Sequence, residues 1–570
     1  MKKTFFLVLV SLCGVSHNTF GQSNYYVSTS GSNFNDGSFL APFEEVQFGI
    51  DQLSPGDTLN ILEGEYHEKV VVSVSGTVSN RITIRNYAND EAILDGVGAG
   101  NAVPMLAITS KNYITIDGLT IRNNEMQDAQ GILIDGGSDG ITVQNCTFYH
   151  INYSTSPTTN VTETDNSQPL IVYGTLGSDA ITNLQILHNE IRTCYTGFSE
   201  GLAINGNVDG FAVVGNSVHD LSNIGIDIIG HEGTSPNPAT DQARNGVVKD
   251  NTVYLCFSEY ATSAGIYVDG GKDLLIERNN TYDNGYGIEI GCENVGKTTD
   301  NIVVRNNLIY VNKVAGLVFG GYDYPSGSGK VTNCEVRNNT FFQNDFTSTY
   351  NGEMYLSYSE NCSIHSNVFR INNRNTLAYA ELSQPGLTMN HNLIYCPAGE
   401  LGLEVSWNGM FYYGYEVFQT GTSYEANGTF GNPQFVTGGG SGLEEFHLAP
   451  SSPAIDAGNP TITVAVGETD FYGNTRQVGS RVDCGAVEFD PNAVSVAEEL
   501  ERIGHYDIVT QQLYLNQKLI GKEFQLISAE GKLVQNGSFQ SSIQRFEHQP
   551  SGVYLLNVEG FATIKLLVIS

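Results

Sequence analysis

A six-residue unit recurs along the middle of the chain and restricts the folds available to it. The unit reads apolar, any, any, Asn, any, apolar, and successive Asn positions are 25 to 35 residues apart. Such a repeat is too short for a strand, a helix and their turns, but it fits one solenoid turn of two or three short strands. We therefore predict an all-β fold, a right-handed parallel β-helix. The copies are ILHNEI (186–191), VVGNSV (213–218), VKDNTV (248–253), VRNNLI (304–309), VRNNTF (336–341), IHSNVF (364–369) and MNHNLI (389–394), and 276–281 keeps its Asn279 but has Thr281 at the last apolar position.

The repeated Asn is predicted to form an inward ladder at a corner of the coil. Asn tolerates the left-handed backbone that a corner needs, and its amide can bond to the turns above and below. Cys334 and Cys362 occupy one slot on adjacent turns. A rung spacing of ~4.8 Å allows a disulfide or an unbonded stacked pair. The nine cysteines include no C-x-x-C pair, so neither a zinc ribbon nor a thioredoxin-like site is indicated.

Four segments are expected along the chain. Residues 1–22, with Lys2, Lys3 and a short apolar core, are typical of a signal peptide. Residues 23–96 should form an N-terminal cap and first turn, with an amphipathic helix at 44–53 plugging the open end. The β-helix with its closing segment spans 97–490, and 497–570 reads as a small β-sandwich with turns at Glu530-Gly531 and Pro550-Ser551-Gly552. No segment has the ~20 apolar residues of a membrane span.

Three stretches resemble known families. Asp36-Gly37, Pro42-Phe43, Pro55-Gly56-Asp57, Gly64 and Tyr66 resemble the start of secreted β-helix proteins, including family 9 polysaccharide lyases. FGNPQF, FHLAPSSPAIDAG and VDCGAVEF within 430–489 are similar to the terminal segment of choice-of-anchor type proteins, which should close the solenoid. Gly552-Val-Tyr554 and Lys565-Leu-Leu-Val568 resemble the C-terminal sorting domain of the type IX secretion system of Bacteroidetes.

The last resemblance implies export through the type IX machinery, followed by release or attachment at the outer cell surface. A generic carbohydrate-binding sandwich is the alternative for this segment. The net charge of −34 argues against nucleic acid and anionic lipid as partners, and we expect a monomer. The charge also suits an anionic substrate poorly, unless a bound cation or a local basic patch intervenes.

A second element, G-apolar-x-apolar-x-G, recurs at 131–136, 201–206, 225–230, 265–270, 287–292 and 316–321. Its apolar positions should face inward, so its x positions face outward and stack from turn to turn. The first x position reads Leu133, Ala203, Asp227, Tyr267, Glu289, Val318. The second reads Asp135, Asn205, Ile229, Asp269, Gly291, Gly320. Ionisable residues concentrate on three successive turns, which makes Asp227, Tyr267 and Glu289 candidate catalytic residues.

Three long turns, 231–246, 292–300 and 321–330, are expected to leave the coil on one side. Insertions of this kind commonly map to the binding face of a solenoid and would wall a groove. The expected rim residues are His231, Glu232, Lys272, Glu293, Tyr322 and Asp323.

Two reactions suit this surface. For a glycosidase, Asp227 and Glu289 lie two rungs apart, about 9–10 Å, near the separation of inverting enzymes, and Tyr267 positions the sugar. For a lyase acting on a uronate, Asp269, Glu289 and Glu293 could hold calcium. Lys272, Arg244 or Tyr267 would then be the base, and His231 a catalytic acid or base. Glu232, Arg244, Tyr322 and Asp323 would contact substrate in either case.

Other interpretations remain open. The outward acids could serve solubility alone, and the chain could be a glycan-binding adhesion protein or a structural coat component. The Asp-Asp-Gly calcium signature of family 9 lyases is absent; Asp209-Gly210-Phe211 is at best a fragment. The row Lys249, Glu277, Arg305, Arg337 is interpreted as a surface ion-pair row of little energetic weight. We expect a secreted carbohydrate-active protein that cleaves an extracellular polysaccharide, as lyase or inverting hydrolase.

Overall fold

The computed structural model describes residues 22–491, except 159, 322, 348 and 437–445. Beyond them it describes 504–507, 512–515, 520–528, 532–540, 543–545, 552–558 and 564–568. The expected signal peptide, apart from residue 22, therefore lies outside the described residues, as do Tyr322, the Glu530-Gly531 turn and residues 550–551. The chain divides into two compact units, Met1–Phe489 and Asp490–Ser570.

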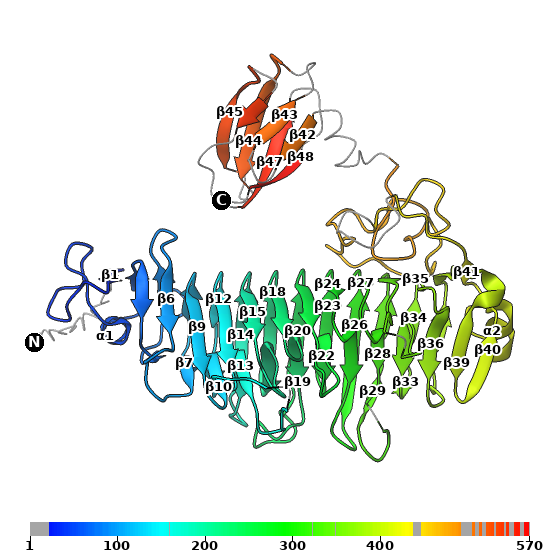
Figure 1. Ribbon diagram of the computed structural model, residues 1–570, viewed down its shortest axis with the longest axis horizontal. Helices are drawn as coiled ribbons and strands as arrows, with labels where there is room; N and C mark the ends of the chain where they lie inside the picture. The colour runs from blue at the N-terminus through cyan, green and yellow to red at the C-terminus, as the bar shows by residue number, and fades with distance from the viewer. Residues whose placement is uncertain are drawn as a thin grey trace, which may run out of the picture. The chain divides into compact units, whose positions relative to one another are not determined.

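The first unit is a coil in which each turn adds a strand to each of three parallel sheets (Figure 1). The predicted parallel β-helix is thus confirmed. Sheet 1 comprises β1 (Asn24–Val27), β2 (Thr58–Ile61), β5 (Ile82–Asn86), β8 (Ile114–Asp117), β11 (Thr142–Gln144), β14 (Ile181–Leu187), β17 (Val208–Val214), β20 (Arg244–Lys249), β23 (Lys272–Glu277), β26 (Thr298–Arg305), β29 (Lys330–Thr332), β30 (Glu335–Arg337), β33 (Ser359–Glu360), β34 (Ser363–His365) and β37 (Thr388–Asn390).

Sheets 2 and 3 follow it around each turn. Sheet 2 comprises β4 (Val70–Val71), β7 (Pro104–Thr109), β10 (Ala129–Asp135), β13 (Ser167–Gly174), β16 (Leu202–Gly206), β19 (Ile226–Ile229), β22 (Ala264–Asp269), β25 (Tyr286–Gly291), β28 (Ala315–Phe319), β32 (Met354–Leu356), β36 (Thr376–Ala380), β39 (Glu404–Trp407) and the antiparallel β40 (Met410–Tyr413). Sheet 3 comprises β3 (Gly64–Tyr66), β6 (Ala92–Asp95), β9 (Thr120–Glu125), β12 (Thr147–Asn152), β15 (Glu190–Cys194), β18 (Ser217–Leu221), β21 (Thr252–Cys256), β24 (Asn280–Tyr282), β27 (Leu308–Tyr310), β31 (Thr340–Phe342), β35 (Val368–Arg370), β38 (Leu393–Tyr395) and β41 (Thr429–Phe430).

The asparagine ladder forms at the corner between sheets 1 and 3. The Asn251 main-chain N–H and side-chain amide both donate to Asn279 Oδ1, at 3.0 and 2.9 Å, and the amide also donates to the Val213 carbonyl at 3.0 Å. The left-handed backbone lies one residue earlier than predicted, at Asp250 (φ 58°) and Arg278 (φ 52°). That preceding residue turns the chain, and the Asn after it points inward.

A second, unpredicted ladder of Asn284, Asn312 and Asn344 runs nearby, and both ladders end on a buried glutamate. The Asn344 side chain donates to Glu353 Oε2 at 2.6 Å. The last residue of the first ladder, Asn392, donates to Glu425 Oε1 at 2.5 Å. Burial raises the pKa of Glu353 to about 8 and that of Glu425 to about 7.

The eight cysteines in the described part of the chain are all unbonded and buried. The Cys334 main-chain N–H donates to Cys362 Sγ at 3.4 Å, so these two residues stack on adjacent turns. Of the two arrangements that the register allowed, the unbonded pair is the one present.

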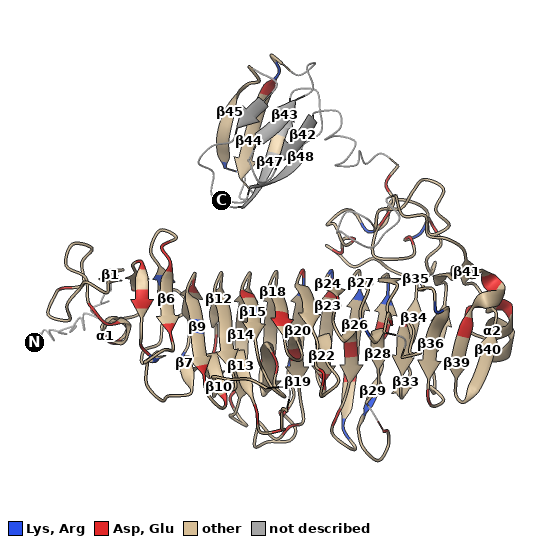
Figure 2. Cartoon of the chain, viewed as in Figure 1, with Lys and Arg blue, Asp and Glu red and all other residues tan. Residues whose placement is uncertain are grey.

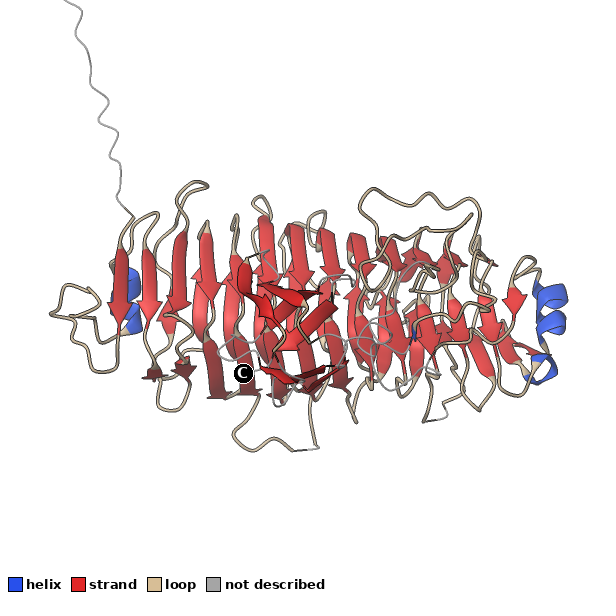
Figure 3. Cartoon of the chain, turned by 90° about the horizontal axis from the view of Figure 1, so that it is seen from above, coloured by secondary structure: helices blue, strands red, loops and turns tan. Residues whose placement is uncertain are grey.

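Helical segments close both ends of the coil (Figure 3). Helix α1 (Val46–Asp51) lies within the predicted segment and buries Val46 and Ile50 against the first turn. At the other end, η1 (Glu400–Gly402), the β39–β40 hairpin and α2 (Tyr415–Thr422) enclose the core. Phe418 of α2 and Trp407 of β39 are buried there, with ring centroids 6.1 Å apart.

Residues 446–489, which we name the strap, do not close the solenoid as expected. They lie along the outer face of sheet 3, where Phe446 and Val487 pack against Leu308, Phe342 and Val368. The physical reason is the apolar character of that face, which would otherwise be exposed to water.

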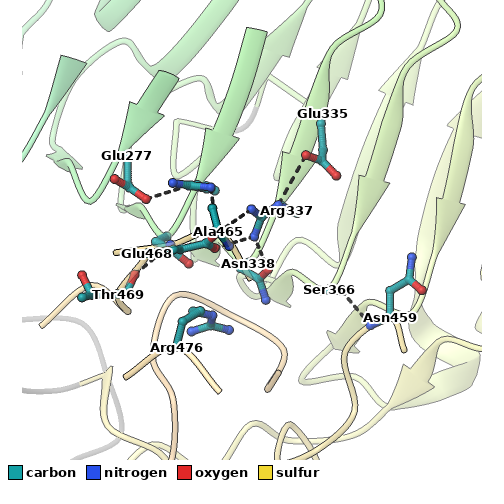
Figure 4. Close-up of polar contacts among 12 residues, drawn as sticks. Glu277, Glu335, Arg337, Asn338, Ser366, Asn459, Ala465, Glu468, Thr469 and Arg476 are labelled. Atoms are coloured by element: carbon teal, nitrogen blue, oxygen red, sulfur yellow. Dashed lines mark hydrogen bonds and ion pairs between the residues drawn. The ribbon is translucent and has the colours of Figure 1, made fainter. Parts of the chain in front are cut away.

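The strap also buries the ion-pair row that was predicted to lie on the surface. Glu468 accepts hydrogen bonds from Arg305 at 2.8 Å and Arg337 at 2.7 Å, and Arg305 also bonds Glu277 at 2.6 Å (Figure 4). Glu277 and Arg337 are each 5 % exposed. The surface interpretation is therefore wrong for Glu277 and Arg337, because the covering segment is far away in the sequence, whereas Lys249 and Arg305 are half-buried.

The second unit contains two antiparallel sheets, as a sandwich requires. One holds β42 (Gly504–Asp507), β43 (Gln512–Leu515) and β46 (Ile543–Arg545). The other holds β45 (Leu533–Ser538), β44 (Glu523–Ser528), β47 (Gly552–Val558) and β48 (Ile564–Val568). Among the described residues of the whole chain, no helix is long and apolar enough to cross a membrane.

Candidate functional site

The three candidate catalytic residues occupy one outward row of sheet 2. Asp227 in β19 pairs with Tyr267 in β22, and Tyr267 pairs with Glu289 in β25. The inward neighbours Ile226 and Ile228 are fully buried, so the predicted alternation of faces is confirmed. One turn was missed: β13 lies between β10 and β16, which places Ile171 between Leu133 and Ala203. Its strand lacks the leading glycine that marked the others.

The three long turns leave the coil at one corner, as expected, because each connects a strand of sheet 2 to a strand of sheet 1. They also touch one another. The Asn294 side-chain amide donates to the Glu232 carboxylate, and the Gly329 N–H donates to the Cys292 carbonyl at 2.9 Å. The loops therefore brace each other beside the outward row.

Six carboxyl groups from successive turns interact on this face, and we name them the carboxyl cluster: Glu200, Asp227, Glu232, Asp269, Glu289 and Glu293. Asp227 is only 3 % exposed and Asp269 is also buried, whereas Glu232 and Glu293 are exposed. Glu200 and Glu289 are half-buried. Sequence reasoning missed Glu200, although it directly precedes the GLAING strand, because it lies in the loop that enters sheet 2 rather than on an outward strand position.

Burial and mutual repulsion favour the protonated forms of Asp227, Glu289 and Glu200. Burial, followed by Glu200 and Asp269, raises the pKa of Asp227 well above its usual range. Asp227 Oδ1 is buried and has no hydrogen-bond partner among the described residues. Burial and the neighbouring Glu293 raise the pKa of Glu289 to about 8, and burial raises that of Glu200 to about 7. Several of these groups are therefore carboxylic acids, able to donate a proton near neutral pH.

Glu293 has a different environment from the other members. Its side chain accepts a hydrogen bond from the Tyr267 hydroxyl at 3.4 Å, which favours the ionised form. Its main-chain N–H donates to Asp269 Oδ1 at 2.6 Å, which holds the start of the 292–297 loop against β22. Burial and Glu232 act in the opposite direction and raise the pKa of Glu293. Tyr267 and Asp269 thus position an exposed carboxyl beside Glu289.

The other predicted site residues make their hydrogen bonds and ion pairs outside the carboxyl cluster. Arg244 and Lys272 stand on adjacent strands of sheet 1 and form ion pairs with Asp209 at 3.1 Å and Asp300 at 3.8 Å. The His231 ring lies 3.3 Å from the Thr298 carbonyl, and burial lowers its pKa. Asp323 is exposed, and Ser326 donates to its carboxylate at 3.5 Å within their own turn.

Under the lyase alternative, Asp269, Glu289 and Glu293 were the residues that could hold calcium. In the part of the chain that the structure describes, no group of three or more His, Cys, Asp or Glu side chains is arranged to hold a metal ion. The Asp269 carboxylate is committed to the Glu293 main chain. The described residues therefore do not fit a calcium site.

Comparison with known proteins places the architecture in a family. The model of the Pel9A-like right-handed β-helix region matches residues 25–361. The chain is 32% identical over 452 residues to the uncharacterized protein YwoF of Bacillus subtilis, covering 76% of this chain and 92% of that protein. It is 32% identical over 76 residues to pectate lyase PEL9 of Emericella nidulans, which is 13% of this chain and 18% of that protein.

Two solved structures are also similar. The crystal structure of pectate lyase Pel9A aligns with a TM-score of 0.45 at 15% identity, covering 82% of this chain and 97% of that one. An alginate lyase from Paenibacillus sp. aligns with a TM-score of 0.38 at 18% identity, covering 55% and 94%. The family match rests on the sequence comparison, which spans more than half of the chain and includes Asp227, Tyr267 and Glu289. The chain belongs to the Pel9A-like right-handed β-helix family.

Proposed function

We propose that this protein hydrolyses glycosidic bonds of a neutral extracellular polysaccharide on the outer face of sheet 2. The observation that carries the proposal is the carboxyl cluster, in which protonated and exposed carboxyls from successive turns share one face beside three long loops. A polysaccharide as the target is in keeping with the relative named a pectate lyase.

Glu289 and Glu293 are the proposed catalytic pair. Glu289 carries a proton near neutral pH and would donate it to the glycosidic oxygen as the bond to the anomeric carbon breaks. Glu293, with the Tyr267 hydrogen bond, would take a proton from the water that attacks that carbon. Asp227 lies two rungs from Glu289, about 9–10 Å away by strand spacing. Because it is buried, we assign it to positioning as a neutral acid.

A lyase is the less favoured reaction. It needs a base beside a uronate, and the candidates Lys272 and Arg244 are on another sheet and already paired with carboxylates. The third candidate, Tyr267, lies in the row, but burial and the neighbouring Asp269 raise its pKa well above the usual range, which disfavours the phenolate that a base requires. The net charge of −34 would also disfavour an anionic sugar.

A glycan-binding protein without catalysis is the second candidate, favoured by the burial of Asp227 and Tyr267. It predicts retention on a polysaccharide column with no product formed. Retention would then be little altered by Glu289→Gln, whereas hydrolysis would be abolished by the same change.

We also propose that residues 1–22 direct export and that 497–570 act as a type IX sorting domain. Supporting this are the sequence resemblance and the antiparallel strands of the second unit. Deletion of 497–570 should leave the protein inside the cell envelope of its host, and secretion of the deleted form would contradict the sorting role.

The test of hydrolysis uses the full chain with xylan, β-glucan and galactan, and with polygalacturonate as the anionic comparison. New reducing ends should appear with a neutral polymer, and Glu289→Gln and Glu293→Gln should each abolish them. Glu259→Gln is the control, because Glu259 is exposed in the loop before β22. Ultraviolet absorbance from unsaturated products, or full activity of Glu289→Gln, would contradict the proposal.

A further inference from the structure

The outward row of sheet 2 continues past the carboxyl cluster to the end of the coil. Glu289 pairs with Val318, and the row then reaches Tyr355 and Tyr379 on the next two strands. Tyr379 pairs with Ser406 in β39, and Ser406 pairs with Phe411 in β40. On the next outward position of the hairpin, Glu404 pairs with Tyr413. We name Tyr355, Tyr379, Phe411 and Tyr413 the aromatic track.

The last two residues of the track are not part of the core. Phe411 is 69 % exposed and Tyr413 is 62 % exposed. The core at this end is supplied by Val405 and Trp407 of the partner strand β39, with Tyr412 of β40 packed against it. Large exposed apolar side chains that stabilise nothing within the fold mark a binding surface when they cluster.

The track also leaves ring faces available to a ligand. Tyr355 and Tyr379 have ring centroids 5.9 Å apart at 20°, but the next residue of the row is the small Ser406. Among the described residues, no ring contacts the other face of Tyr379. By contrast, His219, Tyr254 and Tyr282 on sheet 3 stack at 4.5 and 4.9 Å, so the middle ring is covered on both faces. The rings of sheet 3 support one another, whereas the track presents free ring surface.

Charge and length restrict what can occupy this surface. Tyr355 donates to Glu381 at 2.8 Å, Glu404 lies beside Tyr413, and the row begins at the carboxyl cluster. Figure 2 shows acidic residues along the coil and few basic ones, so an anionic polymer would be repelled. From Glu289 to Phe411 the row spans five rungs, about 24 Å at the usual strand spacing. A flat apolar ring surface of this length suits a chain of uncharged sugar rings.

We propose that the aromatic track binds a neutral polysaccharide chain that lies along sheet 2, from Glu289 toward the C-terminal end of the coil. The proposal rests on the proposed function, because the bound chain is the substrate of the carboxyl cluster. It adds that the polymer runs parallel to the coil axis and that long chains bind better than short ones.

The test compares the full-length wild type with Tyr379→Ser and Phe411→Ser by affinity electrophoresis in xylan, β-glucan and galactan. At least one neutral polymer should retard the wild type, and each change should weaken binding about 3- to 10-fold. The matched control is Leu401→Ser, at the same end of the coil but in η1 and 89 % exposed. Circular dichroism checks the fold of each variant.

The proposed binding by the aromatic track is overturned if Phe411→Ser and Leu401→Ser are retarded equally. It is also overturned if no neutral polymer retards the wild type. A dimer that Phe411→Ser dissociates in sedimentation would also overturn it, because β40 would then be an interface between copies. Failure of hydrolysis is separate: a wild type that binds through the track but releases no reducing ends refutes only the proposed reaction. If the wild type cleaves long chains and Tyr379→Ser cleaves them equally well, only the binding role of the track is refuted.

Discussion

Replacing Glu289 by Gln should stabilise the protein near neutral pH while removing its activity. The pKa of Glu289 is about 8 in the fold, against 4.5 for a freely exposed glutamate. The folded state therefore holds a proton that the unfolded chain releases. A raised folded pKa contributes stability that is fully present below pH ~4.5 and is lost as the pH rises to about 8. At about pH 7 the loss is roughly 3 kcal/mol. Because Gln cannot ionise, the variant avoids this loss of stability.

The assay is urea unfolding followed by the fluorescence of Trp407, the single tryptophan, which is buried at the end of the coil. The unfolding free energy of Glu289→Gln should exceed that of the wild type by about 3 kcal/mol near pH 7 and by almost nothing near pH 4. Glu259→Gln, an exposed control, should match the wild type at both. An equal effect of Glu289→Gln at both pH values would refute the reasoning, because it would show that Glu289 is not held protonated. Gained stability with lost activity is typical of a catalytic group.

Further predictions concern the ladder, the strap, the thiols and the catalytic acid. Asn279→Ala should lower the unfolding free energy by about 3–5 kcal/mol in urea titration, because the Asn251 N–H loses its buried acceptor; an effect under about 1 kcal/mol would contradict this. Glu468→Gln should cost about 3 kcal/mol and expose the strap to proteolysis, whereas the more exposed Glu335→Gln should not. The eight described cysteines should resist thiol labelling until the protein unfolds, and reductant should not alter its melting temperature. Hydrolysis should decline above about pH 8, as Glu289 loses its proton.

The coil could be predicted from its repeats because each turn is specified locally. Alternation of apolar residues fixed which face of β19, β22 and β25 is buried, and the spacing of the copies aligned Asp227, Tyr267 and Glu289. The prediction failed where a feature lacked the local pattern. Ser167–Gly174 has no leading glycine, and the corner residue precedes the ladder Asn rather than coinciding with it.

The site was less predictable than the coil because it depends on contacts between distant segments. Glu200 belongs to the cluster although it lies in a loop. Lys272 lies outside the cluster because the chain turns at Gly270 and Gly271 into sheet 1. The burial of Arg337 depends on Glu468, 131 residues away. No short pattern in the sequence indicates a contact between residues so far apart in the chain.

The asparagine ladders give the coil a polarity. In each ladder the side-chain NH₂ donates to the next turn, so the final amide needs a hydrogen-bond acceptor. A carboxyl oxygen meets that need, and Glu425 supplies it for Asn392. A further asparagine there would instead present a new donor and invite another turn or another molecule. The glutamates thus act as terminators of solenoid growth, and whole turns could be inserted before Glu425 but not appended after it.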